Sequence, residues 1–111
     1  MSDFYYLDEN KNAVPCDPNK WAKQLDEMLE NNTKHVGYFE VEGNRISTVW
    51  LGLDHEWRPG NRPPLIFETM VFDEKGHDCY CERYSTWQEA EEGHKRAIKW
   101  AMDGCKEEDR K

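Results

Sequence analysis

The sequence lacks long apolar runs and any sign of an export signal. No segment approaches the roughly 20 consecutive apolar residues that a membrane helix needs. The first ten residues, MSDFYYLDEN, contain neither the basic region nor the apolar region of a secretory signal peptide. We therefore expect a cytoplasmic protein without a membrane anchor.

Basic residues are also in short supply. The chain has 23 acidic residues against 15 basic ones, which gives a formal net charge of -8. Binding to nucleic acid depends on Lys and Arg neutralising phosphates, so this balance disfavours direct binding to DNA or RNA. An acidic surface suits either a solvated protein or one that docks on a basic partner surface, and charge alone leaves both open.

The common motifs of cofactor and metal sites are missing as well. The sequence has no GxGxxG, P-loop, HExxH or GxSxG, so we expect no nucleotide cofactor. Cys16, Cys79, Cys81 and Cys105 do not have the spacing of zinc ligands, and we expect reduced thiols. His77, Cys79 and Cys81 alternate along a predicted strand and should share one face. Side chains two apart on a strand are about 7 Å apart, whereas zinc-bound atoms lie within about 4 Å, so we predict no metal site.

What the chain does have is aromatic residues spread through a highly charged sequence. Charged residues make up 34% and aromatic residues 13% of the 111 positions. Charge at this level can indicate disorder, but aromatics at strand and helix spacing favour a folded chain. The length fits one domain, residues 1–111, with a charged tail at 106–111 that should fray.

Four strand-like runs occupy the middle of the chain. They are HVGYFEVE (35–42), RISTVWLGL (45–53), LIFETMVF (65–72) and HDCYCERY (77–84). Gly43-Asn44 between the first two is a tight-turn signal, and DEKG links the last two. This order predicts an antiparallel meander whose second and third strands, the most apolar, are central.

Helices are predicted on both sides of these strands, after short extended pieces FYYL (4–7) and AVPC (13–16). Asp17 can cap a helix that begins at Pro18 and ends at Asn31 and Asn32. Thr86 and Glu89 match a capping box at the start of a second helix. The apolar stripe of that second helix comprises Trp87, Ala90, His94, Ala97, Ile98, Ala101 and Cys105. The predicted fold class is α+β: a four-stranded antiparallel β-meander covered by two helices, with a short N-terminal extended segment.

Glu68 and His94 are polar residues at positions where the pattern calls for apolar ones. Glu68 lies mid-strand among apolar residues, and a buried carboxylate either pairs or takes up a proton. It could be a general base or a metal ligand, or it could point to solvent or pair with an arginine such as Arg45 or Arg83 on a neighbouring strand. His94 could hydrogen-bond Glu68, Asp54 or a hydroxyl on the sheet, for proton transfer or for simple burial.

The segment between the second and third strands holds the remaining candidates. Asp54 and His55 follow directly on the second strand, where a rigid element supports accessible side chains. Arg58 and Arg62 could bind a phosphate or a carboxylate, and they could equally be solvated. Trp57 in the same loop either folds back as a plug or contacts a partner.

The segments STVWLGLDH, PPLIFETMVF and RYSTWQEAEEGH resemble a widespread family of small proteins encoded by tailed bacteriophages and prophages. A segment like YLDENKNAVPCD precedes them, and the resemblance covers roughly residues 5 to 100. It implies a phage origin and a setting in the host cytoplasm, and it implies no particular activity and no catalytic residue. Many members have a glycine-rich loop before PPL, where this chain has EWRPGNR, so a role that needs such a loop does not carry over.

Two functional hypotheses follow from these residues. The first is a small acidic phage accessory protein that binds a host or phage protein, with Trp57, Arg58 and Arg62 as contact residues. The second is an enzyme or ligand-binding domain whose Asp54, His55, Glu68 and His94 converge within about 8 Å around one pocket. A homodimer through an exposed sheet face or edge strand is a further expectation, because the predicted sheet is apolar on both faces.

Overall fold

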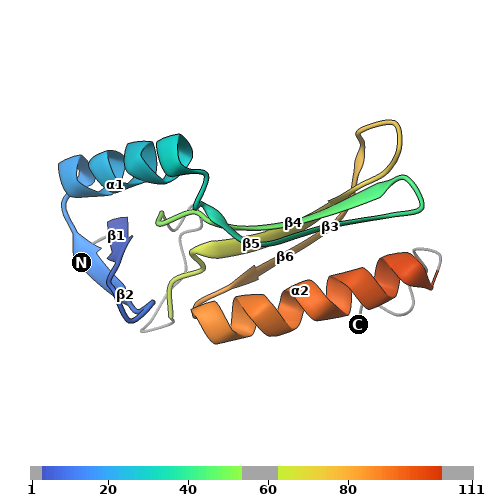
Figure 1. Cartoon of the computed structure of the whole chain (residues 1–111). Helices are drawn as coiled ribbons and strands as arrows, with labels where there is room; N and C mark the ends of the chain where they lie inside the picture. The colour runs from blue at the N-terminus through green and yellow to red at the C-terminus, as the bar shows by residue number, and fades with distance from the viewer. Residues whose placement is uncertain (1–3, 54–62, 104–111) are drawn as a thin grey trace.

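A computed structural model describes residues 4–53 and 63–103 of the chain and gives an α+β fold (Figure 1). In chain order the elements are β1 (Phe4–Leu7), β2 (Ala13–Cys16), α1 (Pro18–Asn31), β3 (His35–Val41), β4 (Asn44–Trp50), β5 (Phe67–Phe72), β6 (Asp78–Tyr84) and α2 (Trp87–Met102). The first two strands form a small sheet of their own, and β3 to β6 form a four-stranded sheet. The predicted fold class is confirmed.

The four-stranded sheet is an antiparallel meander in the order β3-β4-β5-β6, with β4 and β5 at its centre as predicted. The β3–β4 turn differs by one residue from the expected Gly43-Asn44. Val41 pairs with Asn44, so the two turn residues are Glu42 and Gly43, with φ values of 50° and 82°. A two-residue hairpin turn of this kind needs positive φ at both positions, and Glu42 adopts it here so that Asn44 can begin the strand.

Helix α2 lies along one face of the four-stranded sheet and contacts all four strands (Figure 1). The Thr86 hydroxyl accepts a hydrogen bond from the Glu89 backbone N–H at 3.1 Å, which is the predicted cap. The buried residues of α2 are Ala90, Gly93, Ala97, Trp100 and Ala101. Trp100, which lies outside the predicted apolar stripe, packs its ring 4.9 Å from that of Tyr80 and is 4% exposed.

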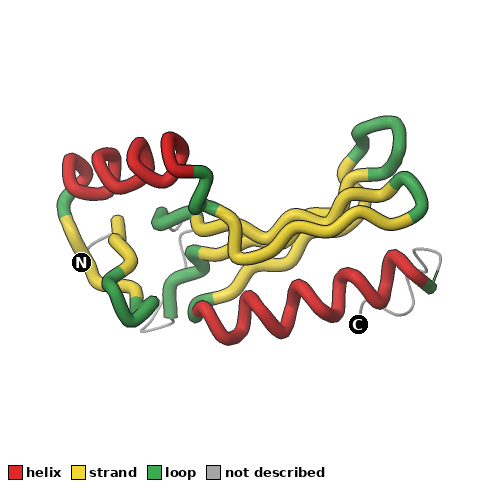
Figure 2. The backbone as a smooth tube through the Cα atoms, viewed as in Figure 1, coloured by secondary structure: helices red, strands yellow, loops and turns green. Residues whose placement is uncertain are grey.

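Helix α1 lies beyond one end of the four-stranded sheet, beside β1 and β2 (Figure 2). The Asp17 side chain accepts a hydrogen bond from the Lys20 backbone N–H at 2.8 Å, and Asn32 ends the helix in the left-handed region. No residue of α1 is buried. Met28 and Trp21 tie it to the rest of the molecule: Met28 packs against the core, and the Trp21 Nε1–H donates to the Leu51 carbonyl at 3.0 Å. The two helices therefore cover the sheet unequally, one along a face and the other at an end.

The two faces of the sheet differ in what covers them. In the two central strands the side chains that alternate toward α2 are buried, as in β5, where Phe67, Thr69 and Val71 are all 0% exposed. The side chains between them, Glu68 and Met70, are half-buried and point to the opposite side. We call that opposite side the open face, because neither α1 nor α2 lies along it in Figure 1.

Neither α1 nor α2, the helices in the described ranges, is long and apolar enough to cross a membrane.

Candidate functional site

The structure places two of the candidate residues, Glu68 and His94. The other candidates, Asp54, His55, Trp57, Arg58 and Arg62, lie outside the described residues.

Glu68 lies on the open face and forms a cross-strand ion pair. The Arg83 Nε–H donates to Glu68 Oε2 at 2.9 Å, and the two residues are direct partners in the β5–β6 register. The Glu68 side chain is 14% exposed, so the ion pair offsets the cost of removing its carboxylate from water. This confirms the interpretation of Glu68 as the partner of an arginine on a neighbouring strand.

The same carboxylate influences Cys81 on β6. The Cys81 thiol lies 3.6 Å from Glu68 Oε2 and donates to it. Partial burial, and secondly the negative charge of Glu68, raise the pKa of the Cys81 thiol. A thiol with a raised pKa is a poor nucleophile at neutral pH, so Cys81 has the opposite character to an activated cysteine.

His94 lies on the other side of the sheet, in the layer between α2 and the strands. Its Nδ1 is 2.6 Å from the Thr48 hydroxyl, which is 2.6 Å from the Thr69 hydroxyl. Both threonines are 0% exposed. The expectation that His94 finds a hydroxyl on the sheet is confirmed. Burial of the ring lowers the pKa of His94, because burial disfavours the charged imidazolium.

The hydrogen bonds of His94 extend across the sheet to Glu82 on β6. Thr69 also bonds the Tyr84 hydroxyl, and Tyr84 donates to Glu82 Oε1 at 2.8 Å. One assignment lets every hydroxyl donate once: His94 Nδ1–H to Thr48, Thr48 to Thr69, Thr69 to Tyr84, and Tyr84 to the Glu82 carboxylate. Burial is the main reason that the pKa of Tyr84 is raised, so Tyr84 remains a neutral donor.

Glu82, the last acceptor in this series of hydrogen bonds, also lies close to other donors. Arg96 of α2 donates to Glu82 Oε1 at 3.0 Å, and the Tyr80 hydroxyl lies 3.4 Å from the same oxygen. Neither Glu82 nor the two buried threonines were among the predicted site residues. A signal was present in the sequence: Thr48 stands between Ile46 and Trp50, at a position where the alternation requires a core residue.

Glu68 and His94 do not converge on one pocket. Glu68 and Thr69 are neighbours in β5 and therefore point to opposite faces, and Thr69 is the one connected to His94 through Thr48. The sheet itself separates the two candidates. Of the alternatives for His94, the approach to Glu68 is wrong, because α2 crosses the face that Glu68 points away from.

The predicted common face of His77, Cys79 and Cys81 is also wrong. The β5–β6 register shifts between Val71 and Phe72, so Cys79 is an extra residue in a β-bulge. Cys79 packs against the core under α2, whereas Cys81 lies beside Glu68 on the open face. Within residues 4–53 and 63–103 no group of three His, Cys, Asp or Glu side chains could hold a metal ion.

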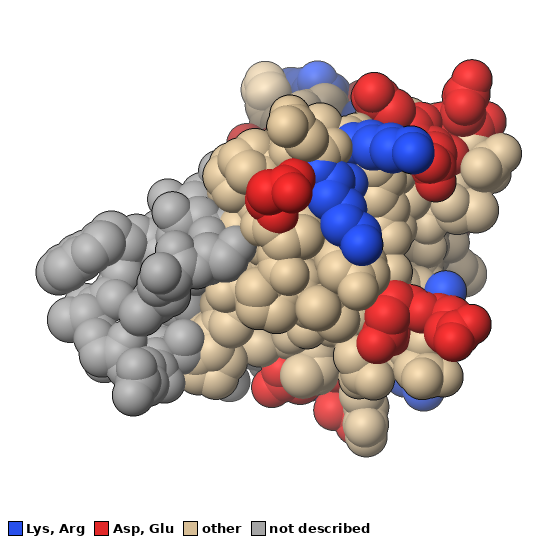
Figure 3. Space-filling view, turned by 90° about the vertical axis from the view of Figure 1, so that its left-hand side faces the viewer, with Lys and Arg blue, Asp and Glu red and all other residues tan. Residues whose placement is uncertain are grey.

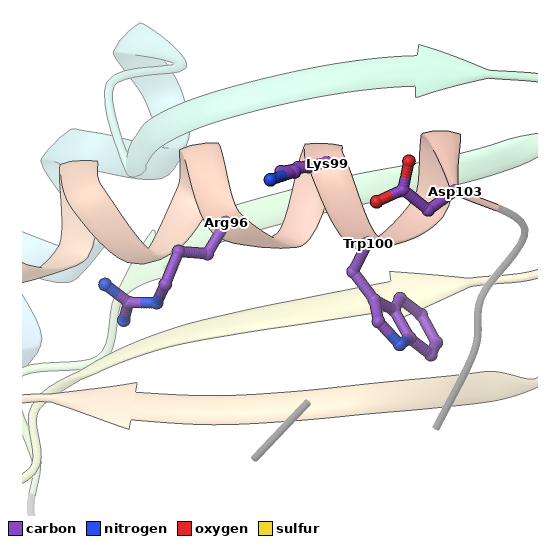
Figure 4. Close-up of a pocket in the computed structure, with 4 residues that line it drawn as sticks. All are labelled: Arg96, Lys99, Trp100 and Asp103. Atoms are coloured by element: carbon purple, nitrogen blue, oxygen red, sulfur yellow. The ribbon is translucent and has the colours of Figure 1, made fainter. Parts of the chain in front are cut away.

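The surface has a shallow hollow of about 300 Å³ near the C-terminal end of α2, lined by Arg96, Lys99, Trp100 and Asp103. Figure 4 shows the Trp100 ring pointing from α2 toward the strands. Arg96 is already bonded to Glu82, and the lining residues Lys99 and Asp103 are of opposite charge. The hollow contains neither of the two described candidate residues.

The opposite end of the molecule, with α1, β1 and β2, carries charges of both signs. In Figure 3 basic and acidic side chains lie next to one another on this end. A second hollow there is lined by Tyr6, Lys20, Lys23, Gln24 and Glu27, and the Lys20 ammonium sits 4.0 Å from the centre of the Tyr6 ring. The Lys20 ammonium is therefore held by a contact within the chain.

Described residues that flank positions 54–62 are joined by backbone hydrogen bonds. The Leu51 and Gly52 N–H groups both donate to the Ile66 carbonyl, at 2.7 and 3.2 Å. The Gly52 carbonyl accepts from the Tyr5 N–H at 2.8 Å, and Leu53 pairs with Phe4. Gly52 has a φ of 70° and packs under the Trp21 ring, where a side chain would collide with the indole.

The chain matches no family model, no curated protein and no solved structure.

Proposed function

We propose that this chain is a small acidic phage accessory protein that acts in the host cytoplasm by binding a host or phage protein, and that it catalyses no reaction of its own. The observation that carries the proposal is the separation of Glu68 and His94 by the sheet. Each has a structural partner, Arg83 for Glu68 and Thr48 for His94. A proton-transfer site would need such groups on the same side of the sheet and open to a substrate.

The buried side of the sheet gives no access to a substrate. Thr48 and Thr69 are 0% exposed beneath α2, so a molecule could reach the hydroxyls only after the helix had undocked. A buried network in which each donor has an acceptor serves to fix the position of a helix on a sheet. This supports a structural role for His94.

The contact residues that we propose are Trp57, Arg58 and Arg62. Among the described residues that flank their segment, Leu51 and Gly52 both donate a backbone hydrogen bond to Ile66. Binding residues are commonly carried on segments with a rigid base, and Trp and Arg are the side chains most enriched at binding hot spots. An acidic protein with two arginines in one segment fits a partner that presents an acidic or carboxylate-bearing spot within a basic surface.

The test is affinity capture from infected cells, followed by mass spectrometry, with the wild type and with Trp57→Ala. Loss of a central interface tryptophan typically costs 2 kcal/mol or more, about thirtyfold in affinity, so the specific partner should be lost. Phe39→Ala is the matched control, because Phe39 is an exposed aromatic residue on β3, 42% exposed, outside that segment. Capture of every specific partner by Trp57→Ala at wild-type levels would contradict the assignment of the contact residues.

A further inference from the structure

We infer that the open face of the four-stranded sheet is a homodimer interface, in which it packs against the same face of a second copy of this chain. The pairing goes beyond the proposed function and does not depend on it, because the residues involved lie on β3 to β6 and not in the 54–62 segment.

Association through a face is favoured over association through the strand edges. The outer strands of the sheet are β3 and β6, and the pairing of each is interrupted by a register shift. In β3 the shift lies between His35 and Gly37, and in β6 it is caused by the extra residue Cys79. Such bulges twist an edge away from a regular hydrogen-bonding ladder and are a common protection against strand addition.

The open face is divided by the register into three rows that run across the strands. The central row is Tyr38, Ser47, Met70 and Cys81, one residue from each strand, and none of them is charged at neutral pH. Tyr38 is 50% exposed, and Cys81 is also exposed. An uncharged row through the middle of a face is the composition expected at the centre of an interface, which is depleted of charge.

The two outer rows carry charges of both signs. The row at the β3–β4 turn holds Glu40, Arg45, Phe72 and Asp78, with the Arg45 guanidinium 5.5 Å from the centre of the Phe72 ring. The row at the other end holds His35, Val49, Glu68 and Arg83. The face thus has three acids against two arginines and a histidine, whereas the whole chain has 23 acids against 15 bases. Two copies of this acidic chain should repel each other least when their nearly neutral faces meet.

The order of the charges selects one arrangement of the two copies. If the two-fold axis runs along the central row, Asp78 faces Arg83 of the second copy, and Glu40 faces His35 of the second copy. If the axis instead runs along the strands, Glu40 faces Asp78 of the second copy, which places two carboxylates together, and Arg83 faces His35 and no acid. Only the first arrangement is complementary, and it keeps the strands of the two sheets nearly aligned, as in common sheet-on-sheet packing.

The size of the face predicts weak association. Four strands about 4.8 Å apart and about six residues long at a rise of 3.3 Å make a face of roughly 20 by 20 Å. Two copies would then bury roughly 800 Å² of flat area, and somewhat more with the relief of the side chains, which is at the low end for specific interfaces. We therefore expect a reversible dimer whose population depends on concentration.

The first experiment is sedimentation velocity on the reduced full chain from about 1 μM to about 1 mM, a range that brackets weak interfaces. The wild type should shift from monomer to dimer as the concentration rises. Asp78→Arg should weaken the dimer more than about tenfold, because the introduced arginine of each copy would then face Arg83 of the other copy. Glu92→Arg on the exposed side of α2 makes the same change in net charge and should leave the dimer intact. If the wild type stayed monomeric over the whole concentration range, the open face would not be a homodimer interface and the inference would be overturned.

Mixing two variants tests the position of the axis. Asp78→Arg alone and the double variant Arg83→Glu/Glu68→Gln alone should each remain monomeric, because like charges then meet across the axis. An equimolar mixture should form heterodimers, because the introduced arginine of the first variant would meet the introduced glutamate of the second. The native Arg83 of the first variant would likewise meet the native Asp78 of the second.

In the double variant Glu68 is also replaced, because it is the β5 partner of position 83. Without that second change, Glu68 and the introduced glutamate would repel each other within one chain. No heterodimer on mixing, with both variants folded by circular dichroism, would contradict this arrangement.

Cys81 provides an independent readout that needs no change of charge. It lies in the central row, so its two copies face each other across the axis, and a short bismaleimide should link them. Cys81→Ser should abolish the linked dimer, and Cys79→Ser should not, because Cys79 packs against the core. A linked dimer that persists in Cys81→Ser would place the contact elsewhere and overturn the inference.

Discussion

Thr48 and Thr69 show how individual polar residues determine the packing of this sheet. Both occupy positions that point under α2, and their hydroxyls would each cost roughly 1–3 kcal/mol if buried without a partner. The 2.6 Å contacts that join them to each other and join Thr48 to His94 remove that cost. Because the hydrogen bond between Thr48 and His94 forms only when His94 stands over Thr48, this network favours one position of α2 over others of similar apolar burial.

Titration of His94 should make the free energy of unfolding depend on pH. The pKa of His94 is lowered in the folded chain, whereas in the unfolded chain it has its ordinary value of about 6.5. Below that value the unfolded chain takes up a proton that the folded chain does not, so the free energy of unfolding falls with falling pH until the folded His94 also titrates. Urea unfolding at pH 8, 7, 6 and 5 should show this loss.

His94→Gln separates this effect from that of the carboxylates. Gln can donate to Thr48 and does not titrate, so the variant should lose less stability than the wild type between pH 7 and pH 5. Asp73, whose pKa is lowered chiefly by a hydrogen bond from the His77 backbone, contributes equally in both proteins and cancels in the comparison. Parallel pH profiles for the two proteins would show that His94 is not the group responsible.

At the scale of elements, α2 approaches the sheet closely because two glycines remove side chains from the interface. Gly93 faces the Tyr84 hydroxyl, and a methyl group at that position would overlap the tyrosine ring. Gly37 on β3 lies under the His94 ring, and a Cβ there would be 2.7 Å from two of the ring atoms, Cδ2 and Nε2. Each glycine is therefore matched to a specific side chain on the opposite element.

The pair Gly37 and His94 can be tested by a double-mutant cycle. Gly37→Ala should destabilise the chain by about 1–3 kcal/mol, because the new methyl group forces the His94 ring away from Thr48. All three of the nearest atoms to the added Cβ belong to His94. In a His94→Ala background the same substitution should therefore cost far less, and thermal or urea unfolding of the four proteins measures the coupling. If Gly37→Ala destabilised the chain equally with and without the His94 side chain, the added methyl group would not be in conflict with the His94 ring.

The elements of this fold follow from local patterns, whereas their contacts depend on geometry that those patterns do not contain. Alternation identifies β4 and β5, and Asp17 and Thr86 begin both helices where their capping side chains predict. The ion pair of Glu68 with Arg83 could also be predicted from the sequence, because neighbouring antiparallel strands bring a mid-strand acid opposite a limited set of residues. For His94 the sequence indicates a hydroxyl on the sheet as one possible partner, but it does not identify Thr48, since the helical period gives the face of α2 and not the strand that the face meets. The bulge at Cys79 likewise arises from pairing with β5 and has no signal in the sequence of β6.

At the scale of the whole molecule, the two helices differ in how firmly they are attached. The structure measures 41 × 35 × 24 Å, with α1 and the small sheet at one end of the long four-stranded sheet (Figure 1). Helix α2 buries five residues against that sheet, whereas α1 buries none, and its Leu29 is 60% exposed. Few buried apolar contacts mean a low free energy for local opening. The N-terminal part should therefore open without the sheet unfolding.

Native-state amide exchange should show this difference. Amides in α1 should exchange at least about tenfold faster than those in α2, which corresponds to about 1.4 kcal/mol less protection against opening. Trp21→Phe removes the hydrogen bond from the indole to the Leu51 carbonyl and should speed exchange in α1 further, while leaving α2 and β5 at their wild-type rates. If instead the substitution raised exchange equally in all elements, the N-terminal part and the sheet would have to unfold together. The 3.0 Å contact of Trp21 would then contribute to global stability and not only to the attachment of one end.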